Sequence, residues 1–112
     1  MNEAVKKISS ESLHRFIQEL FAAGGMRPQE ADWYAETIVQ ANLWGIDSHG
    51  VIRVPTYFNR ILIDAINRKA EIRTIRKAPA ITLIDADGAA GAVAGRVAME
   101  QASVVKWPQL PA

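Results

Sequence analysis

Residues 41–61 read ANLWGIDSHGVIRVPTYFNRI, and the interpretation of the whole chain begins from this stretch. Its centre, Asp47-Ser48-His49-Gly50, follows an amphipathic helix and precedes Arg53 and Tyr57. Histidine can both give and take a proton near neutral pH, and a guanidinium is the usual partner of a substrate carboxylate. The combination suggests chemistry on a small hydroxy or keto acid. The residues alone, however, favour a plain helix cap and turn, in which Ser48 bonds to backbone amides and Arg53 is solvated.

Two helices are predicted on the N-terminal side of this motif. Ser9 is a good N-cap for the first helix, and Gly24-Gly25 is expected to end it. Its apolar stripe consists of Leu13, Phe16, Ile17, Leu20 and Phe21. His14 lies off that stripe and is predicted to be a solvated surface residue without a role.

The second helix is predicted to begin at Pro28 and to end at Gly45, just before the motif. A stripe of mostly small residues would let it pack closely against its neighbour; it consists of Ala31, Tyr34, Ala35, Ile38 and Ala41. Trp33 and Trp44 fall on other faces. Exposed tryptophans are unusual on a monomer and natural at a subunit contact.

On the C-terminal side a third helix is predicted from Ile52 to Asn67, with Pro55 either beginning it or bending it. Its expected buried stripe is Val51, Val54, Phe58, Leu62 and Ile66. Arg53, Tyr57 and Arg60 are three or four positions apart and so share one face.

Further along, residues 80–85 (AITLID) have the length and β-branched content of a buried strand, with residues 72–76 as a possible edge partner. Asp87-Gly88 signals a turn, and another helix is expected after it. The fold class is therefore α/β (α+β). We expect a three-helix segment over residues 1–69, the start of an α/β core over 70–106, and a divergent proline-rich tail over 107–112.

Three features that suggest other functions are weak. Gly88, Gly91 and Gly95 lack the spacing and the surrounding βαβ unit of a dinucleotide-binding loop, so the fold is not predicted to be Rossmann-like. A basic cluster is expected to be a solvated connector, and it consists of Arg68, Lys69, Arg73, Arg76 and Lys77. Two histidines 35 residues apart make a poor metal site, so no metal is expected.

Composition is that of a globular chain, with 49% hydrophobic and 22% charged residues among 112. The net charge of +1 provides no general attraction to nucleic acid or to an anionic membrane. The absence of cysteine rules out disulfides and thiolate chemistry. With no signal peptide and no membrane span expected, the predicted location is cytoplasmic.

The motif resembles the signature of the NAD(P)-dependent malate/L-lactate dehydrogenase family, a non-Rossmann group that includes ureidoglycolate, sulfolactate and 2,3-diketogulonate dehydrogenases. The resemblance rests on Ala41-Asn42-Leu43, Gly45, Asp47-Ser48-His49-Gly50-Val51, Arg53, Pro55 and Tyr57. Residues 12–40 and 83–100 resemble the opening helix pair of that family and its DG-x-x-G turn with the following helix.

The resemblance implies hydride transfer between NAD or NADP and C2 of a 2-hydroxy or 2-keto acid. His49 would exchange the proton at the C2 oxygen, and Ser48 would orient the imidazole or touch the substrate. Arg53 would hold the carboxylate and Tyr57 would line the pocket. Asp47 would orient the His49 ring or cap a helix. The resemblance also implies a homodimer.

Only the N-terminal third of the family is matched, and the cofactor-holding stretches have no counterpart here. We therefore expect a truncated member that is inactive alone. A non-catalytic helical module that associates through Trp33, Trp44 and Trp107 is the main alternative. A small nucleic-acid binder using the basic cluster is a weaker one, because no basic helix face is present.

Overall fold

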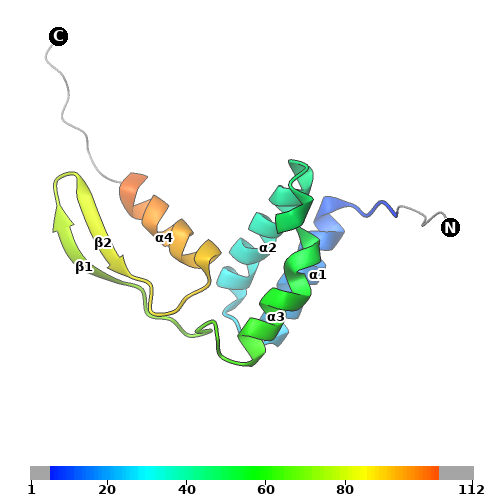
Figure 1. Cartoon of the computed structure of the whole chain (residues 1–112), viewed down its shortest axis with the longest axis horizontal. Coiled ribbons are helices and arrows are strands. Elements are labelled where there is room, and N and C mark those ends of the chain that lie inside the picture. The colour runs from blue at the N-terminus through cyan, green and yellow to red at the C-terminus, as the bar shows by residue number, and fades with distance from the viewer. Residues whose placement is uncertain (1–5, 104–112) are drawn as a thin grey trace, which may run out of the picture.

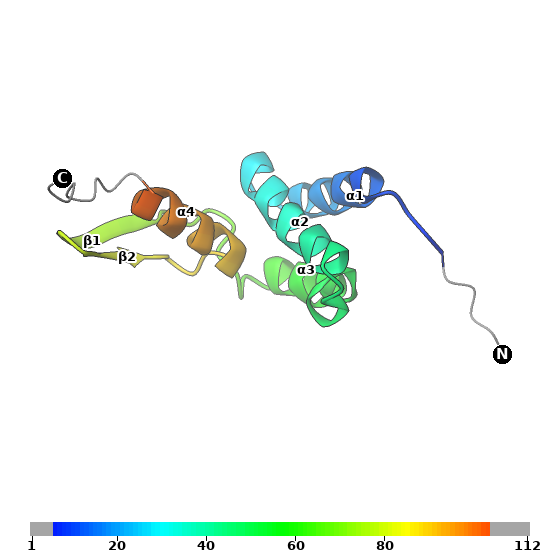
Figure 2. The same ribbon diagram turned by 90° about the horizontal axis from the view of Figure 1, so that it is seen from above.

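The computed structural model describes residues 6–103, which form two groups of elements arranged like the arms of a V (Figure 1). The first group is helical and contains α1 (Ser10–Ala23), α2 (Pro28–Leu43) and α3 (Val54–Leu62). The second contains the hairpin of β1 (Arg73–Ala78) and β2 (Ile81–Asp85), followed by α4 (Gly91–Ser103). Seen from above, the two groups lie side by side and are joined by the segment after α3 (Figure 2). The predicted α/β class, with three helices before the sheet, is confirmed.

The ends of α1 are as predicted. The Ser9 side chain accepts a hydrogen bond of 3.1 Å from the backbone N–H of Ser12, which satisfies one free amide of the first turn. At the other end, Gly25 has φ +105°, and the amides of Gly25 and Met26 donate back to Ala22 and Phe21. This is a Schellman ending, which requires a residue that tolerates the left-handed conformation.

The core lies between α1, α2 and α3. Its largest fully buried side chains in this group are Phe21, Ile17, Ile38 and Ile61. The Phe21 ring packs at 4.9 Å from Tyr34 and is stacked at 6.4 Å with Phe58. The predicted stripe of α1 differs at one position, since Phe16 is 59% exposed.

Helix α2 begins at Pro28, and four of its five predicted stripe residues are buried. The prediction for His14 is wrong. Its Nε2 lies 2.6 Å from Oδ1 of Asp32 on α2, and the pair is partly buried between the two helices. The prediction that Trp33 is exposed is also wrong, because the ring packs against the core and beneath the guanidinium of Arg96, 5.3 Å away. Trp44 is 72% exposed, as predicted.

The third helix is shorter than predicted. Residues 47–53 form two 3₁₀ turns, η1 (Asp47–His49) and η2 (Val51–Arg53), and α3 then begins at Val54 with Pro55 in its first turn. Helix α3 ends at Leu62 because Asp64 adopts the left-handed conformation, with φ 60°. Ile61 is fully buried, whereas the predicted core residue Leu62 is 52% exposed.

The hairpin pairs β1 with β2 antiparallel, with Arg73 opposite Asp85 and a bulge between Thr74 and Arg76. The predicted strand and its edge partner are therefore confirmed, but the prediction that the strand is buried is wrong. Ile81 and Leu83 are 71% and 53% exposed, because the two-stranded sheet has one face uncovered. The basic cluster is not the connector that we expected. Three of its residues lie along β1, and Arg68 binds the Gly24 carbonyl and Asp64.

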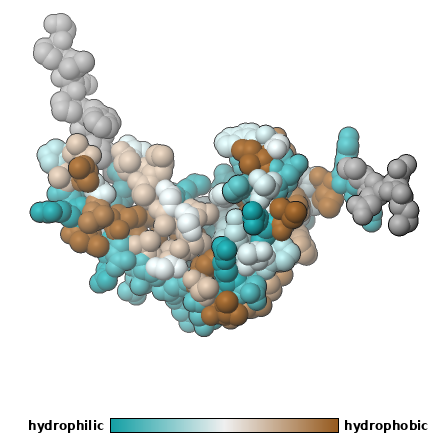
Figure 3. Space-filling model, in the orientation of Figure 1, coloured by the Kyte–Doolittle hydropathy of each residue, from teal (hydrophilic) through white to brown (hydrophobic). Residues whose placement is uncertain are grey.

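One face of the hairpin is left open. Helix α4 contacts β2, and a 3.3 Å hydrogen bond joins Thr74 to Gln101. Three apolar side chains of the hairpin are more than half exposed: Ile75, Ile81 and Leu83. Apolar surface is seen over this group in Figure 3. The predicted tail over 107–112 lies outside the described residues, and the division at residue 69 stays a prediction. In residues 6–103 no helix has the length and apolar character to span a membrane.

The contrast between Ile61 and Leu62 provides a test of the helix register. Ile61→Ala is expected to lower the free energy of unfolding by about 2–5 kcal/mol, because it opens a cavity in the core. Leu62→Ala on the same turn should cost no more than about 0.5 kcal/mol. Urea unfolding of the two variants measures both values. A larger loss at Leu62 would show that α3 is rotated from the position described.

Candidate functional site

The loop that carries His49 is held against the end of α2 by one side chain. Asn42 lies in the last turn of α2, and its Oδ1 accepts a 2.8 Å hydrogen bond from the Val51 amide. Its Nδ2 donates to Oδ1 of Asp47 at 3.0 Å. One amide therefore ties both ends of the Asp47–Val51 loop to a helix that is anchored in the core.

Gly50 is required by this arrangement. A Cβ added at Gly50 would lie 2.3 Å from Oδ1 of Asn42 and 2.4 Å from its Nδ2. No carbon can approach so closely, so a side chain at position 50 would displace Asn42. The glycine of the Ser-His-Gly motif is therefore needed so that the Asn42 side chain can pack against the loop.

The imidazole of His49 is held in place by the hydroxyl of Ser48, the residue before it. Its Nδ1 lies 2.9 Å from Oγ of Ser48, and both side chains are exposed. Asp47, which we expected to orient the ring or to cap a helix, has its carboxylate bonded to Asn42. In this structure the contact that orients the ring comes from Ser48.

His49 lies where two hollows of the surface meet. The first hollow, of about 540 Å³, lies between α2 and α4 and is lined mainly by apolar atoms of Trp33, Trp44 and Ile46. The second, of about 700 Å³, is bounded by α2, α3 and the segment that leads into α4. Thr37, Ala41 and Ala92 also line both hollows. A ligand in either hollow would reach the imidazole.

The two other predicted substrate-binding residues lie differently. Tyr57 lines the second hollow with His49, and its ring packs 5.4 Å from that of Tyr34. Arg53 is folded back toward the loop, where its Nε donates to the Ser48 carbonyl at 2.7 Å. Arg53 is thus beside Ser48 and His49, but it does not line either hollow.

Two further residues of the second hollow were not among the predicted site residues. Arg60 lines it, with its guanidinium 5.8 Å from the centre of the Tyr57 ring. Tyr34 lines it as well and is only 7% exposed. Burial raises the pKa of the Tyr34 hydroxyl well above its ordinary value, and nearby Tyr57 adds to the increase while Arg60 opposes it. Tyr34 is therefore a neutral hydrogen-bonding group near neutral pH.

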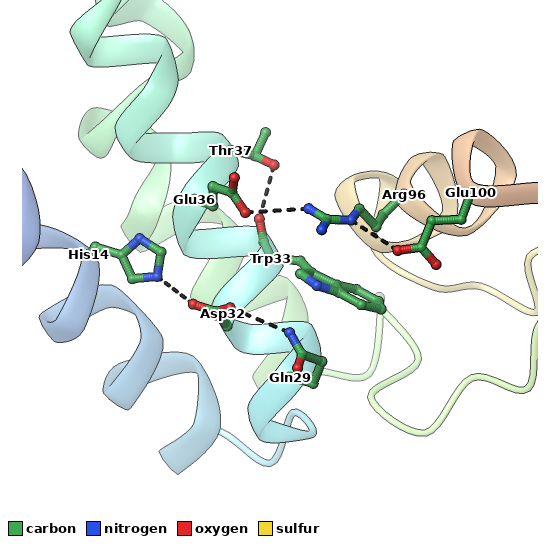
Figure 4. A network of polar contacts seen from close by, with 8 residues as sticks. All are labelled: His14, Gln29, Asp32, Trp33, Glu36, Thr37, Arg96 and Glu100. Carbon is green, nitrogen blue, oxygen red and sulfur yellow. Dashed lines mark hydrogen bonds and ion pairs between the residues drawn. The ribbon is translucent and has the colours of Figure 1, made fainter. Parts of the chain in front are cut away.

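The far side of the first hollow is held to α2 by Arg96 of α4 (Figure 4). Its guanidinium lies over the Trp33 ring, 3.4 Å from Oε2 of Glu36 and 3.2 Å from Oε1 of Glu100. All three charged groups are largely exposed, so each ion pair is worth little alone. Together with the Trp33 ring they orient Arg96 toward α2.

The turn before α4 contains the glycines that were compared with a dinucleotide-binding loop, and its polar groups bond to one another and to the segment before β1. Oδ2 of Asp87 accepts from the Glu71 amide and from Asn67, and Oδ1 of Asp85 accepts from the Asp87 amide. These carboxylates would repel a pyrophosphate. Nor does any group of three or more His, Asp or Glu side chains within residues 6–103 lie suitably for a metal ion.

Comparisons with known proteins identify the family that has this arrangement. The malate/L-lactate dehydrogenase family model matches residues 8–105. Ureidoglycolate dehydrogenase (NAD(+)) of Escherichia coli K12 is 40% identical over 96 residues, which cover 86% of this chain and 28% of that protein. Malate dehydrogenase of Pyrococcus horikoshii is 32% identical over 102 residues, covering 91% and 28%.

Solved structures agree with the sequence matches. The structure of the P. horikoshii malate dehydrogenase superposes with a TM-score of 0.82 at 33% identity, over 85% of this chain and 27% of that one. Sulfolactate dehydrogenase from Methanocaldococcus jannaschii gives a TM-score of 0.81 at 33% identity, over 85% and 28%.

The helical group, the His49 loop and the hairpin with α4 thus have the arrangement found in a class of hydroxy-acid dehydrogenases. The chain belongs to the malate/L-lactate dehydrogenase family, as the resemblance implied. It spans about 28% of the length of the curated relatives that it matches.

A double-variant cycle tests the Asn42–Gly50 contact. Gly50→Ala should lower the free energy of unfolding by about 1–3 kcal/mol, because the new methyl group displaces Asn42. Asn42→Ala removes two hydrogen bonds and should cost about 1–3 kcal/mol as well. The double variant should cost less than the sum by about 1 kcal/mol, since the methyl group then has nothing to displace.

Urea unfolding of the four proteins measures the coupling. Gly95→Ala is the control, because a Cβ there meets nothing within 4 Å and should stabilise α4 by about 0.5–1 kcal/mol. Costs that simply add in the double variant would show that the two residues do not touch.

Proposed function

We propose that this chain is the N-terminal part of an NAD(P)-dependent 2-hydroxy-acid dehydrogenase and contributes the proton-exchanging side of its active site. The observation that carries the proposal is the placement of His49. Its Nδ1 is bonded to Ser48, and the residue lies where the two hollows meet. The 40% identity to ureidoglycolate dehydrogenase supports the same class of reaction.

We propose different tasks for the two ring nitrogens. In the tautomer whose Nδ1–H donates to the serine oxygen, Nε2 is the nitrogen that exchanges a proton with substrate. It would take the proton of the C2 hydroxyl during oxidation and return it to the keto oxygen during reduction. Ser48 orients the ring in both directions of the reaction.

Arg53 and Tyr57 complete the proposed substrate side. The Nε of Arg53 is bonded to the Ser48 carbonyl, which places the guanidinium next to His49. Its remaining N–H groups are proposed to hold the C1 carboxylate of the substrate. Tyr57 lines the hollow that holds the rest of the molecule.

The cofactor of the proposed reaction supplies or accepts the hydride. Because the chain spans about 28% of the length of the relatives that it matches, we propose that the site for this cofactor lies largely outside residues 6–103 and that this chain does not turn over substrate by itself. The choice between NAD and NADP, the homodimer and the cytoplasmic location stay predictions. Asp47 is proposed to act on the loop through Asn42, without touching the substrate.

A second function is favoured by one observation. Leu43, Trp44 and Ile46 form an apolar patch at the end of α2, and they are 64%, 72% and 47% exposed. Such a patch suits a helical association module. If that is the main function, Trp44→Gln should change the oligomeric state in sedimentation experiments while His49→Ala leaves it unchanged.

The catalytic proposal can be tested in a chimera. Residues 8–103 of this chain would replace the matching segment of E. coli ureidoglycolate dehydrogenase, to which the chain is 40% identical over 96 residues. We expect an active chimera in which His49→Gln lowers kcat by about 10²–10⁴-fold, the usual contribution of one positioned acid–base group.

His14→Gln is the matched control, because it changes the other histidine, which pairs with Asp32 away from both hollows. It should leave kcat within about twofold, because His14 lines neither hollow. An active chimera that keeps its kcat after His49→Gln would contradict the proposed proton transfer. Equal losses in both variants would point to damage to the fold.

A further inference from the structure

The first hollow has an aromatic wall that the proposed proton transfer does not require. On the α2 side this wall includes Trp33, Trp44 and Ile46. Trp44 is 72% exposed and Ile46 is 47% exposed, so much of the wall is open to water. Thr37 and Gln40 add a hydroxyl and an amide to the same lining. An aromatic wall with a few hydrogen-bonding groups is the kind of groove in which proline-rich segments dock.

The chain itself contains a segment of this kind. Residues 104–112 read VVKWPQLPA and come directly after α4 in the sequence. A polyproline II helix has three residues per turn, so in that conformation Trp107 and Leu110 would share one edge. Pro108 and Pro111 would share a second edge. The third edge would be small or polar, and it would consist of Lys106, Gln109 and Ala112. Two apolar edges and one polar edge suit a groove that is open to solvent on one side.

The end of α4 is close enough for this segment to reach the hollow. Arg96 of α4 lines the hollow, and Ser103 is seven residues beyond it, about 10 Å further along at 1.5 Å per helical residue. Trp107 is four residues beyond Ser103, and an extended chain of that length spans up to about 13 Å. Pro108 disfavours helical backbone at Trp107, which favours a change of direction after α4. Figure 1 shows α2 and α4 on different arms of the V, with α4 ending where the arms are apart.

The uncovered face of the hairpin suits this segment less well. Its exposed apolar side chains, Ile75, Ile81 and Leu83, are all aliphatic and provide no ring against which a proline could stack. The positive charge of Lys106 would also be repelled by the basic residues of β1, which are Arg73, Arg76 and Lys77. The lining of the first hollow includes one glutamate and one arginine, so their charges are balanced. Ring chemistry and charge therefore both favour the first hollow.

We propose that residues 104–112 dock into the first hollow of the same chain, with Trp107 against the wall formed by Trp33 and Trp44. Attachment to α4 raises the effective concentration of the segment to the order of millimolar, so a weak contact is sufficient for docking. The docked segment covers apolar surface that is otherwise exposed to water. It also closes the approach to His49 from the first hollow and leaves the approach from the second hollow open. The contact does not depend on the proposed reaction.

Paramagnetic broadening in NMR spectra of the full chain tests this docking. Because the chain has no cysteine, Ala112→Cys provides a single attachment point for a nitroxide on the polar edge of the segment. We expect the label to broaden the indole N–H signals of Trp33 and Trp44. Trp107→Ala in the labelled chain should remove that broadening. In the unlabelled chain Trp107→Ala should also shift the Trp44 signal, because the Trp44 ring loses an aromatic neighbour.

Two further variants of the labelled chain separate docking from mere proximity. Gln109→Ala is the matched control within the segment, because it changes the polar edge and should keep the broadening. Trp44→Ala changes the hollow instead of the segment and should reduce the broadening of the Trp33 signal. Indole signals of Trp33 and Trp44 that stay sharp would overturn the inference, and so would broadening that survives Trp107→Ala.

The same label distinguishes the other places where the segment could bind. Broadening confined to the amides of β1 and β2 would place it on the hairpin and would contradict the proposal. A mixture of isotope-labelled chain without nitroxide and unlabelled chain with nitroxide reports only on contacts between two copies. We expect no broadening in that mixture. Broadening of the Trp33 and Trp44 signals there would show that the segment docks on a second copy and would overturn docking within one chain.

Discussion

The two hydrogen bonds of the Asn42 side chain are the constraint on which the candidate site depends. Helix α2 is fixed in the core by Tyr34 and Ile38, and Asn42 transmits that fixed position to the Asp47 side chain and the Val51 amide. The loop has only short 3₁₀ turns of its own, which are weak elements. Without the amide of Asn42, the position of His49 would depend on an exposed loop. These hydrogen bonds are possible because Gly50 has no Cβ, which would otherwise collide with the Asn42 side chain.

The same helix also organises both hollows around His49. One face of α2 provides Trp33 and Glu36, which bind Arg96 of α4, and another provides Tyr34, which packs against Tyr57 of α3. The imidazole therefore lies between a mainly apolar hollow and a basic one. This asymmetry suits a substrate whose charged end must be distinguished from its reacting carbon.

Features set by local chemistry could be predicted from the sequence. The cap at Ser9, the glycine ending at Gly25, the proline start of α2 and the hairpin all depend on neighbours within a few residues. Features set by packing could not. The His14–Asp32 pair depends on how α1 lies against α2, and the left-handed Asp64 shortened α3 without a glycine to signal it. The Asn42 side chain bonds to Val51, nine positions further along the chain, and the sequence does not reveal the direction of that side chain. Arg60 shared a predicted face with Arg53 and Tyr57, but only the fold shows that it lines the hollow beside His49.

The central claim is that these residues provide the substrate side of a dehydrogenase site without the site for its cofactor. Titration of the folded chain with NADH and NADPH tests it most directly, followed by the fluorescence of Trp33 and Trp44 on the rim of the first hollow and by nicotinamide emission. The account predicts no saturable binding of either nucleotide at millimolar concentration. Saturable binding, and above all loss of NADH after addition of pyruvate, would contradict it and would show that the cofactor site lies within this chain.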